Sequence, residues 1–458
     1  MLAPSASRPR ELATLADALA DAAGRFGTPV YVVDLDSVAR AAADVRAAFP
    51  EPWQLQYSLK ANDLPAITAF LQQLGWGANV VSTGEWRSAR KAGVPAADVT
   101  FEGIGKTDAE LRTAVIATAE HEAPRWLAVE SAAEAHRLAE LAAQHRLGHD
   151  GRPPIDVLLR LNPQVHPETR IEFAVGSGSS KFGMDIAEIR ELVTGGVFDH
   201  NGLRLRGVHV HIGSDLRDVR AYAAAGVRAA RLLAEIAAVF DTADTIDFGG
   251  GFPPARPDSP TPQDFFDALI SALHAAGLAL PARPAIEPGR YLVGDSGWLV
   301  GSVLHARARG GMPQQIVLDV GMTEFIRPAL YGSRHAVVAL GHDADAVDTA
   351  VEGPVCESTD TFGTHPLPRM QRGELVAIEG AGAYGASFTS RYNGRPAPAE
   401  ALLWPDGRLE RADRQRLDVT PIADGYAARA GQDGAHDTDE SKFTAAADSR
   451  HARRSDPR

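Results

Sequence analysis

The sequence predicts an α/β protein in which a parallel (β/α)8 barrel precedes a mainly β domain. Eight short apolar runs alternate with helical stretches over about 240 residues, the size and rhythm of such a barrel. An open doubly wound sheet is the other arrangement of βαβ units, but no Gly-x-Gly-x-x-Gly sequence opens the first helix. After about residue 298, strands separated by Gly, Pro and Asn turns follow with hardly any helix, which indicates the β domain.

The predicted elements divide the chain into four parts. The barrel strands are expected at 53–60, 78–82, 98–102, 126–129, 155–161, 205–212, 245–248 and 284–287. The helices between them are expected near 64–74, 84–92, 107–120, 131–146, 185–194, 217–239 and 261–276. The parts are then an N-terminal helix and strand that pack with the β domain (1–35), the barrel (36–297), the β domain (298–426) and a disordered tail (427–458).

The second domain and the tail differ sharply in composition. Strands of the β domain are expected at 299–308, 315–320, 335–340, 375–379, 401–403 and 417–421, and the β-branched run 30–33 is expected to join them. From Ala427 onward Phe443 is almost the only large apolar residue. Such a composition buries too little surface to become ordered, so we expect a disordered tail.

Composition excludes several classes of function for this chain of 458 residues. A net charge of −13 argues against a nucleic-acid partner or an anionic membrane surface. No stretch approaches the ~20 apolar residues that a membrane span needs. A single cysteine, Cys356, permits no intrachain disulfide and fits a reducing compartment. We therefore expect a cytoplasmic protein without a membrane or nucleic-acid partner.

The ends of the predicted barrel strands carry polar residues and glycines. In a parallel barrel the catalytic face lies at the carboxyl ends of the strands. Five runs stand at such ends: Lys60-Ala-Asn62, Arg160-Leu-Asn-Pro163, His209-Val-His211-Ile-Gly-Ser214, Gly249-Gly-Gly251-Phe252 and Glu287-Pro-Gly-Arg290. We expect these side chains to define one site.

Each of these residues also has an ordinary structural interpretation. Lys60 in a dry barrel mouth is a plausible nucleophile towards an aldehyde, but a lysine can also extend its amine from a strand end to water. The Gly249–Gly251 run offers N–H groups at the start of a helix for a phosphate, or forms a plain tight turn. Glu287 at an apolar strand end has a raised pKa or pairs with a cation such as Arg290.

The histidines His209 and His211 lie at i and i+2 on one strand, so both point to the same face. They suggest a metal pair, an imidazole stacked on a flat cofactor ring, or buried core histidines. No third ligand is spaced to complete a metal site, and we predict none.

Taken together, these motifs resemble the fold-type III PLP-dependent decarboxylases, and within them the diaminopimelate decarboxylases most. The motifs that carry the resemblance are Tyr-Ser-Leu-Lys60-Ala-Asn, Gly84-Glu85, Lys181-Phe-Gly183, His211-Ile-Gly-Ser214, Gly249-Gly-Gly-Phe252, Glu287-Pro-Gly-Arg290, Arg327-Pro-Ala-Leu-Tyr331, Cys356-Glu-Ser-Thr-Asp360 and Gly382-Ala-Tyr384-Gly. They occur in order between about Gly27 and Pro421. The resemblance implies the barrel and β domain shared by alanine racemase and ornithine decarboxylase, with pyridoxal 5′-phosphate (PLP) in the barrel.

The resemblance also implies a role for each cofactor-binding residue. Lys60 would carry PLP as a Schiff base, and Glu287 would face the pyridine nitrogen and keep the ring an electron sink. Related racemases place an arginine at that nitrogen, so a glutamate favours decarboxylation. His211 would stack on the ring. The phosphate would be held by Ser214, Gly250, Gly251 and Tyr384, with Arg290 beside them.

Substrate recognition is implied by the same resemblance. Arg290, Arg327 and Tyr331 match the positions that hold the distal carboxylate of diaminopimelate, with Tyr384 close by. Glu357 would hold the distal ammonium. Cys356 would reprotonate the substrate's Cα, although a lone cysteine is often only a small buried apolar residue. In the family this loop reaches a partner's active site, which implies a homodimer with shared sites.

Three departures from the family pattern keep other substrates open. Asn79 stands where the family usually has Asp, Val175 and Ser177 to Ser180 replace a Thr-Gly run, and Asp215 stands where Gln is common. We expect decarboxylation of meso-diaminopimelate to L-lysine. The alternatives are decarboxylation of another amino acid or a siderophore- or carrier-linked conjugate, a racemase, and a non-enzymatic homologue.

Overall fold

The structure is a computed structural model that describes residues 12–178, 180–199, 202–308, 310, 313–342 and 345–412. The strand expected at 417–421, the end of the expected β domain and the tail expected at 427–458 lie outside the described residues.

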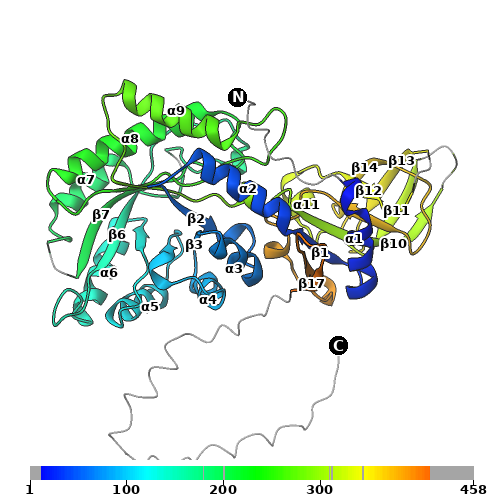
Figure 1. The fold of residues 1–458 in the computed structure, drawn as a ribbon, viewed down its shortest axis with the longest axis horizontal. Helices are drawn as coiled ribbons and strands as arrows, with labels where there is room; N and C mark the ends of the chain where they lie inside the picture. The colour runs from blue at the N-terminus through cyan, green and yellow to red at the C-terminus, as the bar shows by residue number, and fades with distance from the viewer. Residues whose placement is uncertain are drawn as a thin grey trace, which may run out of the picture. The chain divides into compact units, whose positions relative to one another are not determined.

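A closed parallel barrel forms the first domain, which confirms the predicted fold class. Its strands are β2 (Gln54–Ser58), β3 (Gly77–Val80), β4 (Val99–Phe101), β5 (Trp126–Val129), β6 (Ile155–Leu161), β7 (Leu203–Val210), β8 (Thr245–Asp247) and β9 (Arg283–Ile286). The barrel closes where β9 pairs with β2, placing Ala285 beside Gln54 and Ile286 beside Leu55. Its strands are buried on both faces, as expected for a parallel sheet covered by helices (Figure 1).

Helices follow the strands at the predicted places. They are α2 (Leu35–Ala48), α3 (Pro65–Gln73), α4 (Thr83–Lys91), α5 (Asp108–Ala119), α6 (Ala132–Gln144), α7 (Ile186–Thr194), α8 (Val219–Ala237) and α9 (Pro262–Ala275). Side chains fix where several begin: Thr107, Asp185 and Thr261 each form a capping box with the acid three residues later. None of the helices in the described part of the chain is long and apolar enough to cross a membrane.

The second domain is a sheet that includes a strand from the start of the chain. β1 (Val30–Asp34) pairs antiparallel with β10 (Gly297–Arg307) and parallel with β16 (Ala399–Leu403). Figure 1 shows β1 and β10 beside helix α1 (Leu12–Phe26). The remaining strands are β11 (Gln314–Leu318), β12 (Val337–Ala339), β13 (Val347–Glu352), β14 (Thr361–Leu367), β15 (Leu375–Ile378) and β17 (Leu409–Arg411). Tyr31 anchors β1, because its buried hydroxyl donates to the Glu324 carbonyl at 2.6 Å.

Several short elements were not predicted. β14 carries a glycine and a proline and lies at the end of the sheet, where a proline removes no needed ladder bond. β13 and β17 were also missed. Two short helices stand at functional motifs: α10 (Arg290–Val293) directly follows Glu287-Pro-Gly, and α11 (Arg327–Tyr331) has a proline in its first turn.

A loop of the β domain is fixed directly to the turn that carries Lys60. The Tyr384 N–H donates to the Ala61 carbonyl at 2.7 Å, and Asn62 Nδ2 donates to the Gly382 carbonyl at 3.0 Å. Tyr384 adopts a left-handed φ of 56°, which a bulky residue tolerates only when its surroundings hold it there. The two hydrogen bonds fix this loop against the Lys60 turn, so a loop of the β domain forms part of the mouth of the barrel.

We predict that Gly382→Ala loosens this junction. A Cβ at Gly382 would lie 1.8 Å from the Val293 carbonyl oxygen, so the loop must move away from the barrel. Overpacking of this kind costs about 1–3 kcal/mol or more, and the urea midpoint should fall accordingly. Gly24→Ala is the matched control. Its Cβ would meet open space within α1, and removing a helical glycine should raise stability by up to about 1 kcal/mol. Equal midpoints for wild type and Gly382→Ala would contradict the close approach.

Candidate active site

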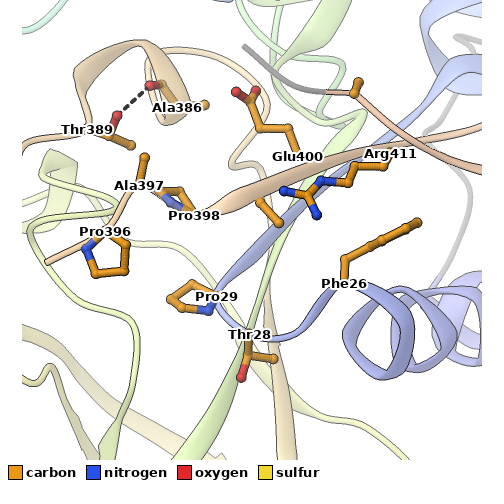
Figure 2. A pocket seen from close by; sticks show the side chains of 12 residues that line it. Phe26, Thr28, Pro29, Ala386, Thr389, Pro396, Ala397, Pro398, Glu400 and Arg411 are labelled. Carbon is orange, nitrogen blue, oxygen red and sulfur yellow. Dashed lines mark hydrogen bonds between the residues drawn. The ribbon is translucent and has the colours of Figure 1, made fainter. Parts of the chain in front are cut away.

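Several cavities open in the described part of the chain, and volume alone does not identify the functional one. One of them, about 440 Å³, lies in the β domain where β1 and β16 begin (Figure 2). Prolines and alanines supply much of its wall, together with Phe26, Glu400 and Arg411. No residue predicted to act in catalysis or binding lines this cavity.

The second cavity, about 330 Å³, opens at the carboxyl ends of the barrel strands. It brings together side chains from strands distant in sequence: Lys60, Val81, Glu102, Arg160, Val175, Phe182, His209, His211 and Glu287, with the backbone of 103–105. The expectation that the strand ends meet is therefore confirmed for Lys60, Arg160, His209, His211 and Glu287, whereas Ser214, the glycines 249–251 and Arg290 are not among the residues that line this cavity. Glu102 joins them although it was not predicted.

Lys60 lies on a single 3-10 turn, Leu59–Ala61, immediately after β2. Its side chain is partly buried, and no carboxylate of the described residues lies within ion-pair distance of its amine. Its charge does reach Glu85, whose carboxylate accepts the Val81 N–H at 2.8 Å. Burial raises the pKa of Glu85 to about 6, while the Val81 N–H and the Lys60 charge act in the opposite direction.

Glu287 ends β9 among polar side chains rather than beside a cation. Asn79 Nδ2 donates to Glu287 Oε1 at 2.6 Å, and His209 Nε2 lies 3.6 Å from Oε2. Arg290, the cation considered as its partner, instead donates from Nε to Ser214 Oγ at 3.0 Å. Glu287 is 3% exposed, so this acid is held dry at the base of the cavity.

Three carboxyl groups share this base with one imidazole. His209 Nε2 lies 3.1 Å from Glu102, and burial lowers the pKa of His209 to about 4, so the ring is neutral. Burial, with the Glu287 charge next, raises the pKa of both Glu102 and Asp247. Glu102 and Asp247 therefore retain protons more readily than ordinary carboxyl groups.

Two carboxyl groups that could bind a metal ion together with His209 lie near it in space, although the spacing in the sequence did not reveal them. One ligand atom from each of Glu102, His209 and Glu287 lies within 4.8 Å of the others. The same three groups face the cavity that contains the Lys60 amine. A second interpretation is that the buried acid pairs with the protonated pyridine nitrogen of a cofactor whose aldehyde is bound by the amine.

The glycine run lies beside His211, but not at the start of a helix, so that expectation is wrong. The run follows β8, and α9 begins only at Pro262 after a loop. The Gly249 N–H donates to Asp247 Oδ1 at 2.8 Å, and the Gly250 N–H donates to His211 Nδ1 at 3.2 Å. Burial, and then the Lys60 charge, lowers the pKa of His211 well below its ordinary value, which leaves a neutral ring able to accept that bond.

Two buried arginines, Arg290 and Arg327, form the far end of the site. Each guanidinium lies over aromatic rings: Arg290 is 4.7 Å from the Tyr384 centroid, and Arg327 is 5.6 Å from that of Tyr331. Neither has a carboxylate within ion-pair distance in the part of the chain that the structure describes. Burial and the neighbouring Arg290 charge lower the pKa of Arg327 to about 10. Two neighbouring guanidinium groups with no carboxylate at ion-pair distance among the described residues favour anionic ligands.

Cys356 and Glu357 stand apart from this group on an exposed loop. Tyr392 donates its hydroxyl to Glu357 Oε1 at 2.6 Å, and Asn393 Nδ2 lies 4.0 Å from Cys356 Sγ. Within the described residues, neither side chain lines the Lys60 cavity.

Comparison with known proteins decides the family. The profile described as "Pyridoxal-dependent decarboxylase, pyridoxal binding domain" matches residues 35–294. Diaminopimelate decarboxylase of Aquifex aeolicus is 34% identical over 390 residues, spanning 84% of this chain and 89% of that protein. The chain belongs to the pyridoxal-dependent decarboxylases.

Solved structures agree with this membership. The diaminopimelate decarboxylase from Helicobacter pylori complexed with L-lysine is 30% identical and covers 86% of this chain and 95% of its own, with a TM-score of 0.77. A lysine/ornithine decarboxylase from Vibrio vulnificus complexed with putrescine is 21% identical with a TM-score of 0.71, and shares the fold. The predicted family and fold are thereby confirmed.

The cofactor of a pyridoxal-dependent decarboxylase is PLP, and the cavity fits it. Lys60 offers an amine that pairs with no described carboxylate, and Glu287 offers a buried acid on the same wall. His211 lines the same cavity with a neutral flat ring, whose Nδ1 accepts the Gly250 N–H. Ser214 Oγ, the backbone of Gly250–Gly251 and the Arg290 guanidinium provide polar groups suited to a phosphate.

Sequence reasoning missed Glu102 and Asp247 among the residues at the base of this site. A signal existed for both, since each acid stands at the end of an apolar strand just as Glu287 does. Asn79 was noted only as a departure from the family pattern, without its contact to Glu287. Such contacts depend on how neighbouring strands are staggered, which the sequence does not state.

Proposed function

We propose that this pyridoxal-dependent decarboxylase converts meso-diaminopimelate to L-lysine and CO₂. One observation carries the proposal: two buried arginines, which have no carboxylate at ion-pair distance among the described residues, lie over the ring of Tyr384. The N–H of Tyr384 is in turn bonded to the carbonyl of Ala61, the residue after Lys60. One guanidinium suits the phosphate of PLP. The second requires another anion, and diaminopimelate, unlike ornithine or lysine, retains a distal carboxylate when its other carboxylate leaves.

The residues of the site would bind and orient the cofactor in the following way. PLP, when bound, accepts the electron pair left by the breaking Cα–carboxylate bond. Lys60 would hold the cofactor's aldehyde end, while Glu287 stabilises a positive ring nitrogen. His211 would pack against the ring and keep water from one face. Ser214, Gly250, Gly251, Tyr384 and Arg290 would fix the phosphate and so orient the scissile bond.

Recognition of the far end of the substrate would fall to α11. Arg327 and Tyr331 lie at i and i+4 on this helix, so both side chains face the same side. A guanidinium matches the planar geometry of a carboxylate and can bind both oxygens. Glu357 would pair with the distal ammonium, and Cys356 would return a proton to Cα.

The exposed position of Cys356 and Glu357 supports a homodimer. Both act on substrate only if their loop enters a cavity, and in this chain they contact Tyr392 and Asn393 at the surface. We infer that the loop of one protomer enters the active site of its partner. The sites would then be shared between the two chains.

A cytoplasmic location is inferred from the single cysteine, because an exposed thiol such as Cys356 persists best in a reducing compartment. Fractionation of the source cells tests this inference, and recovery of the protein outside the cytoplasmic fraction would contradict it.

The product assay tests the main proposal. Purified enzyme with PLP should release CO₂ and L-lysine from meso-diaminopimelate, and Lys60→Ala should lose the visible absorbance of lysine-bound PLP together with activity. Bound PLP without lysine would reject the proposed substrate and leave decarboxylation of another amino acid, since Val175 lines the cavity where the family has a different residue. Interconversion of amino-acid enantiomers would point to a racemase. Absence of Lys60-dependent absorbance would reject any PLP chemistry.

Arg327→Ala should raise KM for diaminopimelate. Losing a charged hydrogen-bond pair costs about 1.5–3 kcal/mol, which corresponds to a KM roughly 10- to 100-fold higher. Arg231→Ala, which removes an exposed guanidinium on α8, is the control and should leave KM unchanged. An unchanged KM for Arg327→Ala would mean that another group holds the distal carboxylate.

Mixing two inactive variants tests the shared sites. Lys60→Ala and Cys356→Ala should each be nearly inactive alone, yet regain activity when unfolded together and refolded, because mixed dimers contain one intact site. Tyr331→Phe mixed with Lys60→Ala is a useful control, because both substitutions fall in the same proposed half-site and no mixed dimer gains an intact site. Sedimentation as a monomer, or no recovery in the Cys356 mixture, would contradict a shared site.

A further inference from the structure

Acidic and basic groups surround Glu287 at the carboxyl ends of the strands, but one of its hydrogen bonds comes from a neutral amide, that of Asn79. The titratable and charged groups that face this position are Lys60, Glu102, Arg160, His209, Tyr222 and Asp247. The Asn79 amide donates from Nδ2 to Glu287 Oε1 at 2.6 Å. An amide neither gains nor loses a proton, so the donor of this hydrogen bond does not change with pH.

The orientation of the Asn79 amide is fixed by three neighbours. Nδ2 donates to Glu287 Oε1 and, at 3.2 Å, to Thr100 Oγ1. Oδ1 faces the Ser58 hydroxyl at 3.4 Å. Turning the amide over would set its oxygen against the Glu287 carboxylate, which is repulsive, so only one orientation is favourable. Asn79 is 1% exposed, and water cannot replace these bonds.

A carboxyl group at position 79 could make the same contact only while protonated. Once ionised, it would lie within hydrogen-bond distance of a second carboxylate in a dry environment, where like charges cannot both persist. The amide therefore donates this hydrogen bond at every pH, whereas an acid would donate it only at a pH at which it is protonated.

We propose that Asn79 is a positioning residue that holds the Glu287 carboxylate in one orientation beneath the cofactor's ring, through a hydrogen bond whose donor does not titrate. The inference rests on the proposed role of Glu287. Asn79 touches neither substrate nor reacting atoms in this scheme. It acts through Glu287 by fixing the direction of that carboxylate.

Asn79→Asp tests the proposal through pH. The ratio of its kcat to that of wild type should be near one at acidic pH, where the introduced carboxyl group keeps its proton. The ratio should then fall about tenfold for each pH unit above the pKa of the pair formed by that group and Glu287, because one proton is lost. KM should change little. A ratio that stays constant with pH would overturn the proposal.

The apoprotein provides a readout without cofactor or substrate. Burial and the Glu287 charge raise the pKa of the introduced carboxyl group in the folded state above its unfolded value of about 3.9, so the folded state binds the extra proton. The stability that this proton contributes is present at low pH and is lost as pH rises through the folded pKa. The deficit in Tm of Asn79→Asp relative to wild type should therefore grow with pH and then level off. A deficit independent of pH would mean that Asn79 serves packing alone and would overturn the proposal.

A swapped pair keeps the test decisive if the single variant does not fold. In the double variant Asn79→Asp with Glu287→Gln, the amide introduced at position 287 donates to the carboxylate introduced at position 79. The hydrogen bond is thereby restored with its polarity reversed. The Tm of the double variant should follow the wild-type pH dependence, while its kcat should remain low because the charge has moved. A pH-dependent Tm deficit in the swapped pair would contradict the assigned bond.

Thr100→Val is the matched control. It removes the second acceptor of the same amide without adding charge, so its Tm deficit and kcat ratio should not vary with pH. The substrate question is separate. Absence of lysine production by wild type rejects the proposed function, whereas the apoprotein Tm profiles decide the role of Asn79 whatever the substrate is.

Discussion

The pairing of β9 with β2 is the constraint on which the active site depends. Closing the barrel places Ile286 beside Leu55, and so brings the segments that follow, with Glu287 and Lys60, onto the wall of one cavity. In an open sheet these two strands would lie at opposite edges. An amine and an acid can thus face the same bound molecule because the barrel is closed and its strands are parallel.

Electrostatics divides this cavity into two unlike ends. At the carboxyl ends of the strands, Glu102, Asp247 and Glu287 lie around a neutral imidazole, and burial favours the protonated forms of the first two. At the mouth, Arg290 and Arg327 are buried among aromatic rings. Isolated buried charges are costly, so both ends gain from a ligand that is cationic at one end and anionic at the other.

The sequence predicted those features that depend on local pattern. Apolar periodicity located the barrel strands and helices to within a few residues, and the ordered motifs indicated the family. The β14 strand was missed because Gly363 and Pro366 are tolerated at a sheet edge but weaken a strand signal. The short helix of Arg327 was missed because five residues show no periodicity. The contact between Asn79 and Glu287 depends on the stagger of β3 against its neighbours, a property of the closed barrel rather than of either segment.

The pairing of β1 also bears on how the chain is made. This strand is synthesised before any barrel strand, yet its parallel neighbour β16 begins at Ala399. A nascent chain therefore exposes the unpaired, apolar edge of Val30–Asp34 throughout synthesis of the barrel. Assembly of the mouth around Tyr384 must wait as well, since that loop comes after β15. The complete site is consequently available only once the Tyr384 loop has been synthesised and bonded to the turn that carries Lys60.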